Sequence, residues 1–295
     1  MGTVNILSKK IRVVHEKRFI CKNILLPIIL PLVLCEVITN YFPRKKVLSV
    51  MQAIFNISES RRLLLESFMF VYPIFIFCIF FFLYRKFISK IFWKRNLLPE
   101  NQYFLVSVWS LKIATFISGL DQGSATSLPI WQYIDYLYNK ESFGWRYLTL
   151  KTPDVTQSPK GTEIKQVFYQ KNDDKNMSPV RSIIVADTYP IDMDLLPEFV
   201  TNHDYVLFQR LVNNQTDRVR GYNQDLVLDI IRQIRKAETD GVQDIYLLLN
   251  TSPTHVTEIM RESFQDAGRN SIKHLYVYES QSESPFRFVK PHRIY

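Results

Sequence analysis

The stretch "SFMFVYPIFIFCIFFFLY", residues 67–84, carries no charged side chain over eighteen positions. A helix needs roughly 20 apolar residues to cross a hydrocarbon core of about 30 Å. The stretch therefore predicts a membrane-spanning helix. Burial in a soluble core is the alternative interpretation.

A second apolar stretch precedes it, "NILLPIILPLVLCEVITNYF" at residues 23–42. Basic residues stand before it, but no small-x-small cleavage site follows, so a signal peptide is not indicated. Glu36, Pro27 and Pro31 weaken the pattern, so the buried-helix alternative suits this stretch better than the stretch at 67–84. Together the two stretches predict a two-helix transmembrane hairpin within a membrane region at residues 1–99.

The distribution of charge supports this division. Residues 1–95 hold sixteen Lys and Arg against four Asp and Glu, a net +12, which leaves 21 against 24, or −3, for the rest. The basic excess thus surrounds the apolar stretches and indicates a membrane rather than nucleic acid. Eleven basic residues flank the outer ends of the hairpin and five lie in its connection, which predicts that both termini are cytoplasmic.

Other features of this region leave alternatives open. Cys21, Cys35 and Cys78 are all found here, without the spacing of a disulfide framework or a metal site. Glu36 is either functional, at a helix interface or a water-filled path, or an interfacial residue near the helix end. Residues 85–95, "RKFISKIFWKR", are amphipathic and either lie along the inner membrane surface or extend the second helix.

Residues 100–295 have the composition of a mixed domain. Their last ninety positions alternate strand and helix, and the strands "SIIVADT" and "DIYLLLN" are almost wholly apolar. Such runs are typical of a mainly parallel sheet covered by helices on both faces, so the fold class is α/β. Strands are expected at 103–108, 145–150, 164–170, 182–188, 205–211, 244–250 and 274–280, and helices at 129–139, 223–238 and 254–266.

Two polar turns follow apolar strands: "ADTYP" after the strand at 182 and "NTSPT" after the strand at 244. Ligands of open parallel sheets bind beyond the carboxyl ends of the strands. The hydroxyls of Thr251, Ser252 and Thr254 can cap the following helix, and amides at its start attract phosphate. The second turn is therefore interpreted as both a cap and a site.

Catalytic patterns are missing from the sequence. It has no glycine-rich phosphate loop, and no HxxxH, CxxC or GxSxG. Asp187 with Asp192 and Asp194 could form a carboxylate cluster, although a turn with caps explains them as well. We therefore expect a binding domain with neither catalytic residues nor a metal. The alternatives are a membrane-tethered nucleotide-processing enzyme and a membrane anchor with a protein-binding domain.

The order "SIIVADTYPIDMDLLP", "YVLFQRL", "YNQDLVLDIIRQIRKAE", "DIYLLLNTSP" and "IKHLYVYES" resembles the C-terminal half of SAVED domains over residues 180–280. These are CARF-like, Rossmann-type sensors of cyclic oligonucleotides in bacterial CBASS anti-phage systems. With the two apolar stretches, the layout is similar to that of two-transmembrane SAVED effectors. The N-terminal half of the family is only weakly recognisable, in "GLDQGSATSLPIWQYIDYL" and "WRYLTLKTP".

The resemblance implies a mechanism without a cofactor. A partner nucleotidyltransferase makes a cyclic di- or trinucleotide, which the domain at 100–295 binds. The homo-oligomer then forms a pore in the lipid of the bacterial inner membrane. The ligand-binding residues that it implies are Asp187, Thr188, Tyr189, Asn250, Thr251, Ser252 and Thr254, together with Tyr278 and Glu279, which would read a base.

Two further sets of residues each have alternative interpretations. Arg218 and Arg220 either pair with phosphates or belong to a solvated loop. The tail "FRFVKPHRIY" interleaves Phe286, Phe288 and Tyr295 with three basic residues, and it either lines a phosphate site or subunit contact or packs on the sheet edge.

Overall fold

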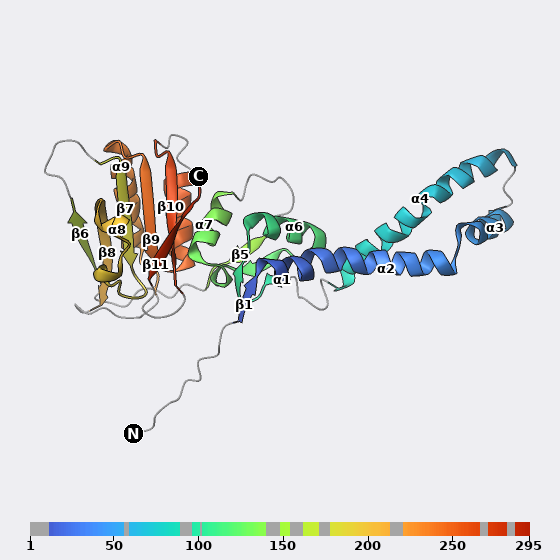
Figure 1. Cartoon of the computed structure of the whole chain (residues 1–295), viewed down its shortest axis with the longest axis horizontal. Helices are drawn as coiled ribbons and strands as arrows, with labels where there is room; N and C mark the ends of the chain where they lie inside the picture. Colours follow the sequence, from blue (N-terminus) through green and yellow to red (C-terminus); the bar gives the residue numbers. More distant parts are fainter. Residues whose placement is uncertain are drawn as a thin grey trace, which may run out of the picture. The chain divides into compact units, whose positions relative to one another are not determined.

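A computed structural model describes residues 12–55, 59–88, 96–100, 102–139, 148–153, 162–170, 178–212, 221–265, 271–281 and 287–295 (Figure 1). The chain forms two compact units. The first comprises Met1–Gly123 with Trp145–Thr149, and the second comprises Ser124–Gly144 with Leu150–Tyr295.

The first apolar helix of unit 1 is longer than the sequence predicted. α1 (Glu16–Ile20), η1 (Cys21–Leu25) and α2 (Leu26–Tyr41) form one helix of 26 residues that is apolar enough to span a membrane. Its π-helical turn η1 ends two residues before Pro27, which has no N–H to donate to the carbonyl four residues earlier. The helix therefore starts seven residues before the predicted span, with Lys17, Arg18 and Lys22 on it.

The second apolar helix is α4 (Glu59–Leu83), continued by η2 (Tyr84–Ile88), and its apolar part is Met69–Phe87. η2 bears out the predicted extension of this helix as far as Ile88, while residues 89–95 lie outside the described part. Cys35 of α2 donates from Sγ to the carbonyl of Pro73 in α4, at 3.2 Å. The hairpin buries little else, since most of its leucines, isoleucines and phenylalanines stay exposed.

The connection between the apolar helices contains α3 (Arg44–Phe55), which the sequence analysis missed. Val47, Leu48 and Met51 are half-buried, whereas Val50 and Ile54, one turn apart, are exposed. Its three basic residues open the helix. This combination is typical of a helix that lies in a membrane interface.

The base of the first helix is tied to a small platform. β1 (Arg12–His15) pairs in parallel with β3 (Gln102–Leu105), and α6 (Val108–Ser118) follows. Oε1 of Glu16 accepts hydrogen bonds from the Ser107 hydroxyl at 2.5 Å and the Ser110 hydroxyl at 2.7 Å, at the start of α6. A second sheet has the order β2 (Asn96–Leu98), β4 (Gln122–Ser124), β5 (Thr149–Lys151).

Unit 2 contains a six-stranded sheet in the order β11-β10-β9-β7-β8-β6. The four central strands are parallel, and the edge strands β6 and β11 are antiparallel to their neighbours, so the predicted mainly parallel sheet is confirmed. The strands are β6 (Thr162–Tyr169), β7 (Val180–Ala186), β8 (Asp204–Val212), β9 (Asp244–Asn250), β10 (His274–Ser280) and β11 (Phe288–Arg293).

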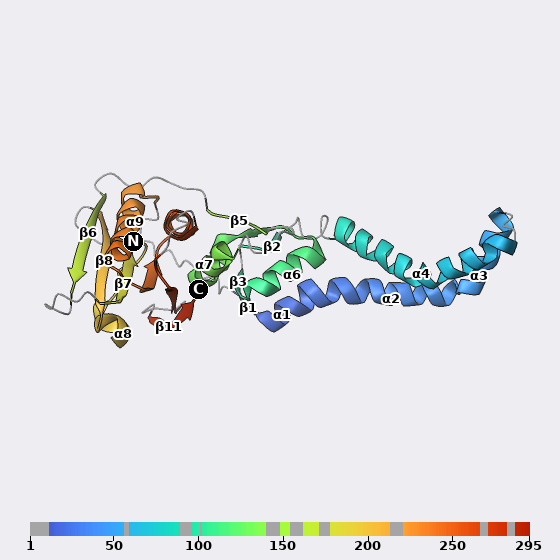
Figure 2. The same ribbon diagram turned by 90° about the horizontal axis from the view of Figure 1, so that it is seen from above.

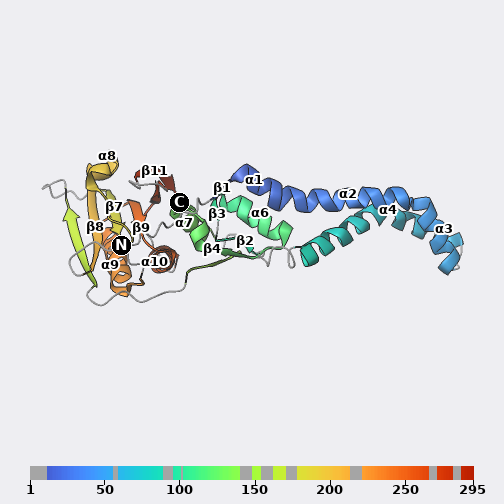
Figure 3. The same ribbon diagram turned by 90° about the horizontal axis from the view of Figure 1, so that it is seen from below.

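Helices cover both faces of this sheet. η5 (Met193–Leu195) and α8 (Glu198–Thr201) lie on one face, and α9 (Gln224–Thr239) and α10 (Pro253–Met260) lie on the other (Figures 2 and 3). On the first face Leu196 and Val200 pack against Ile184 and Leu248. On the second, α9, which the sequence predicted at 223–238, buries an apolar stripe that includes Leu226, Ile230 and Ile234. η3 (Ala125–Ser127), α7 (Ile130–Tyr138) and η6 (Arg261–Gln265) complete the described helices of the unit.

Candidate functional site

The two polar turns lie side by side at the carboxyl end of the sheet. β7 and β9 are parallel neighbours whose last paired residues are Ala186 and Asn250. The amides of Asp187 and Thr188 both donate to the carbonyl of Asn250 at 3.0 Å. The Thr188 hydroxyl donates to Oδ1 of Asn250 at 2.7 Å, and Nδ2 of Asn250 donates to the Tyr189 carbonyl at 3.0 Å. The turns are thus joined by both main chain and side chains.

Asp187 is the centre of a buried ionic network. The register continues one residue beyond the paired strands, which brings Asp187 level with Arg210 of β8 and with Thr251. Asp187 Oδ1 lies 2.8 Å from Nε of Arg210, and Oδ2 accepts from the Thr251 hydroxyl at 2.6 Å. Both charged side chains are at most 2% exposed. The ion pair explains how an aspartate can be buried here, because unpaired buried charges are very costly.

His255, in the first turn of α10, completes the network. Its Nε2 accepts the backbone N–H of Asn223 at 2.9 Å, so its hydrogen lies on Nδ1 and the ring is neutral. Nδ1 is 3.1 Å from Oδ2 of Asp187 and 2.8 Å from the Thr251 hydroxyl. Since both ring nitrogens bond within the protein, the histidine positions the turn and does not offer a base to a substrate.

Arg210 and His255 were missed by the sequence analysis, although β8 carried a signal. Val206, Phe208 and Arg210 alternate along β8 and are all buried, so the arginine occupies a core position. A charged residue in the buried phase of a strand indicates a buried partner. His255 had no comparable signal, because apart from Thr251, four residues earlier, its partners Asp187 and Asn223 lie in distant segments of the chain.

The turn at "NTSPT" is a helix cap. The Ser252 hydroxyl accepts from the amide of His255 at 3.3 Å, and Pro253 occupies the first turn of α10. The cap half of the interpretation is therefore confirmed, and the binding half stays a prediction. Ser252 and Thr254 are half-buried, whereas Thr251 is buried.

Tyr222 packs beside this network. Its ring centroid lies 5.3 Å from that of His255, and its hydroxyl donates to the carboxylate of Glu258. Burial, and then the bond to Glu258 and its charge, raise the pKa of Tyr222 to about 12. Arg218 and Arg220 lie outside the described residues.

Tyr278 and Glu279 lie on β10, the parallel neighbour of β9, and the side chain of each has partners within the protein. Tyr278 is buried in the core with Ile184 and Phe288, so its ring faces packed side chains. Glu279 Oε2 lies 3.0 Å from Nε2 of His292, whose ring stacks on Trp131 at 3.7 Å. The tail forms β11 against β10, which bears out edge packing, and Tyr295 stacks on Tyr138; Phe286 lies outside the described residues.

The carboxylates after β7 do not converge. The side chain of Asp192 accepts from the amide of Asp194 and caps η5, which bears out the turn-and-cap reading of that pair. Within the described segments, no three His, Cys, Asp or Glu side chains gather as a metal site would require.

The connections around the turns form a topological switch point. The chain leaves β7 toward η5 and α8 on one face, and leaves the adjacent β9 toward α10 on the other (Figures 2 and 3). In open α/β sheets, ligands bind in the crevice where neighbouring connections diverge in this way. The topology therefore selects the residues at 187–189 and 250–254 as the candidate site.

Comparison with known proteins gives one match over nearly the whole chain. The family model described as the SMODS- and ubiquitin system-associated 2TM effector domain matches residues 8–295. Among curated proteins the comparison finds no match. The two apolar helices of unit 1 agree in number with the 2TM of that description.

Proposed function

The chain belongs to the SMODS- and ubiquitin system-associated 2TM effector family, and we propose that its second unit is a SAVED-like sensor of a cyclic di- or trinucleotide in a CBASS anti-phage system. The family description indicates a membrane effector of a nucleotidyltransferase-associated defence system. In the proposal, the nucleotidyltransferase supplies the ligand. Binding drives homo-oligomerisation, and the hairpins of several copies form a pore in the bacterial inner membrane.

The switch point between β7 and β9 is the observation that carries the proposed ligand site. A phosphate of the nucleotide is placed at the start of α10, where the helix dipole favours negative charge and the hydroxyls of Ser252 and Thr254 are half-exposed. Beneath them, the network of Asp187, Arg210 and His255 holds the turn rigid. Preorganised polar groups lose less entropy on binding, which favours a specific ligand.

We infer that the domain binds without turning over its ligand. The carboxylate of Asp187, the best candidate for acid–base or metal chemistry, already accepts from Thr251 and His255 and pairs with Arg210. A carboxylate engaged in this way is a poor base. Turnover of a cyclic or linear nucleotide that is lost in Asp187→Asn, with the fold intact, would favour the enzyme instead.

The proposed topology has both termini in the cytoplasm. Its support is the excess of basic residues at the outer ends of the hairpin, eleven against five in the connection. A protease added to sealed inside-out vesicles should then cleave unit 2. Protection of unit 2 in those vesicles would reverse the orientation.

A thermal-shift screen of the full chain in detergent tests ligand binding. At 100 times Kd, a ligand stabilises the folded state by about 2.7 kcal/mol, which is a readily measured rise in Tm. We expect one member of a panel of cyclic di- and trinucleotides to give such a rise. No rise with any member would favour a protein-binding anchor.

Ser252 offers a matched pair of variants for the site itself. Aspartate and asparagine are both good N-cap residues, so Ser252→Asp and Ser252→Asn should both preserve α10. Only the aspartate adds negative charge where the phosphate is placed. Ser252→Asp should therefore lose the thermal shift and ligand-dependent dye release from vesicles, while Ser252→Asn keeps most of both. Equal behaviour of the two variants would remove the phosphate from this turn.

A further inference from the structure

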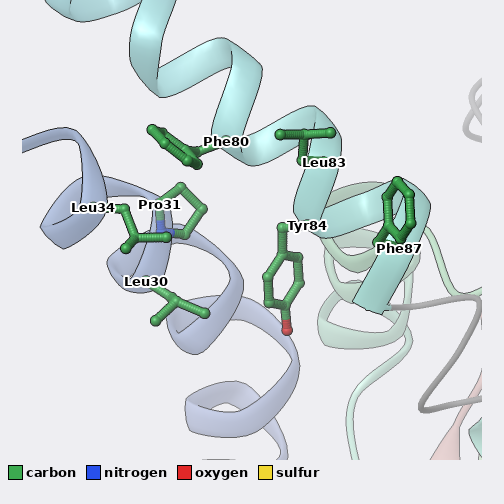
Figure 4. A pocket seen from close by; sticks show the side chains of 7 residues that line it. All are labelled: Leu30, Pro31, Leu34, Phe80, Leu83, Tyr84 and Phe87. Atoms are coloured by element: carbon green, nitrogen blue, oxygen red, sulfur yellow. The ribbon is translucent and has the colours of Figure 1, made fainter. Parts of the chain in front are cut away.

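An apolar cavity lies between the two helices of the hairpin. Its volume is about 350 Å³, and it is lined by Leu30, Pro31 and Leu34 of α2, by Phe80 and Leu83 of α4, and by Tyr84 and Phe87 of η2 (Figure 4). Figure 4 shows side chains of both helices facing the space from opposite sides. The cavity belongs to unit 1 alone and is separate from the turns of unit 2.

Water is not a suitable occupant of this space. The volume would hold about a dozen water molecules at about 30 Å³ each, and each water needs two to four polar partners. Among the lining side chains, only the hydroxyl of Tyr84 is polar. An occupant made of hydrocarbon would lose no hydrogen bonds there and would fill the contacts that an empty space forfeits.

The position of the cavity along the hairpin indicates which hydrocarbon fills it. The contact between Cys35 and Pro73 fixes the register of the antiparallel helices. Lys22 lies thirteen residues before Cys35, and Lys86 lies thirteen residues after Pro73, so the two exposed lysines come to about the same level. Apart from Phe87, which follows Lys86, the lining residues lie between that level and the Cys35 contact. The cavity therefore extends from a pair of cations toward the middle of the span.

We propose that this cavity binds one acyl chain of an anionic phospholipid, whose headgroup is held at the level of Lys22 and Lys86. Basic side chains at a membrane surface attract anionic lipids by about 1 kcal/mol each, which is about fivefold in affinity. Pro31 and Tyr84, which are both buried, form part of its concave wall, and this wall makes it a defined site within the surrounding lipid. The site exists in the hairpin as it stands and does not depend on the nucleotide proposal.

Photolabelling of the full chain tests the proposal. The protein is placed in phosphatidylcholine vesicles that contain a trace of phosphatidylglycerol with a diazirine in its acyl chain. Peptides that contain residues 30–34 and 80–87 should carry most of the label. Leu34→Trp, which fills the cavity, should lose most of that label, whereas Leu32→Trp, on an exposed position outside the lining, should keep it.

Headgroup selectivity is tested by charge. Lys22→Gln and Lys86→Gln should each lower labelling by about fivefold. Lys45→Gln and Lys46→Gln make the same change on α3, beyond the Cys35 contact, and should leave it unchanged. Label spread evenly over the exposed faces, or insensitive to Leu34→Trp, would show surrounding lipid only. Equal labelling by a phosphatidylcholine probe, or cross-links from these residues to a second copy in place of lipid, would also overturn the site.

Discussion

The carboxyl end of the sheet in unit 2 and the hairpin of unit 1 differ in which side chains they bury. At the carboxyl end of the sheet, Asp187 is buried and bonded to two other buried side chains, Arg210 and His255. On the hairpin, isoleucines such as Ile29 and Ile74 are more than half exposed. The buried charges of unit 2 have partners inside the protein, whereas the exposed apolar side chains of unit 1 suit a surrounding of lipid.

The two units differ in how many of their contacts are specific. The hairpin is held by few specific contacts, of which the bond from Cys35 to Pro73 is one, because lipid gives little hydrophobic drive to helix association. The carboxyl end of the sheet is held by hydrogen bonds and an ion pair between defined side chains. Loss of one of these side chains leaves its partner unpaired. Substitutions should therefore lower stability strongly at the carboxyl end of the sheet and only slightly on the outer faces of the hairpin.

The largest effect is expected from Arg210→Met. The change leaves the carboxylate of Asp187 buried without its cation, and breaking a buried pair in this way costs about 3–5 kcal/mol. Unfolding of the full chain in detergent, followed by circular dichroism, measures the loss. The double variant Asp187→Leu with Arg210→Met should be much less damaged, because no unpaired charge remains. A double variant as unstable as Arg210→Met would show that packing, and not the charge, sets the cost.

Matched isoleucines test the contrast more directly. Ile230 of α9 is fully buried, so Ile230→Ala should lower stability by about 2–5 kcal/mol. Ile74 of α4 is 60% exposed, and Ile74→Ala should change stability by less than about 0.5 kcal/mol. Both are measured by the same unfolding experiment. A large loss in Ile74→Ala would mean that this face is covered, for instance by another copy.

The sequence predicted those parts of the fold that depend on local patterns. β9 and β10 have the predicted bounds, and the two apolar helices agree with the predicted spans to within a few residues except at Glu16. There the helix includes Lys17 and Lys22. Basic residues are compatible with a helix, so they limit the apolar stretch but not the helix itself. α3 and α6 were missed, and β11 was expected only as one of the alternatives for the tail.

The candidate site could be predicted only in outline. The two turns were recognisable as polar segments after apolar strands, whereas the partners of Asp187 depend on strand order and register. Tyr278 illustrates the limit, because an aromatic near a strand end can face either a ligand or the core, and this one faces Phe288. Alternation along a strand gives two faces but does not say what covers each.

The Ser252 cap should give an intermediate effect. Ser252→Ala removes the acceptor for the His255 amide at the start of α10, which typically costs about 1 kcal/mol. Ser252→Asn retains an acceptor and should cost much less. Thermal unfolding compares the two. If alanine and asparagine were equally tolerated, the hydroxyl would not be stabilising α10.

The smallest effect is expected at Glu36, the acidic residue within the first apolar helix. Its neighbour Cys35 contacts Pro73, which is four residues after the apolar helix begins at Met69, so Glu36 lies about one turn inside that boundary. The side chain is exposed and at this depth can reach the interface. Glu36→Gln should therefore leave ligand-dependent dye release unchanged, whereas Val33→Glu, about one turn deeper, should hinder insertion. Loss of dye release in a folded, inserted Glu36→Gln protein would instead assign this carboxylate to the assembled pore.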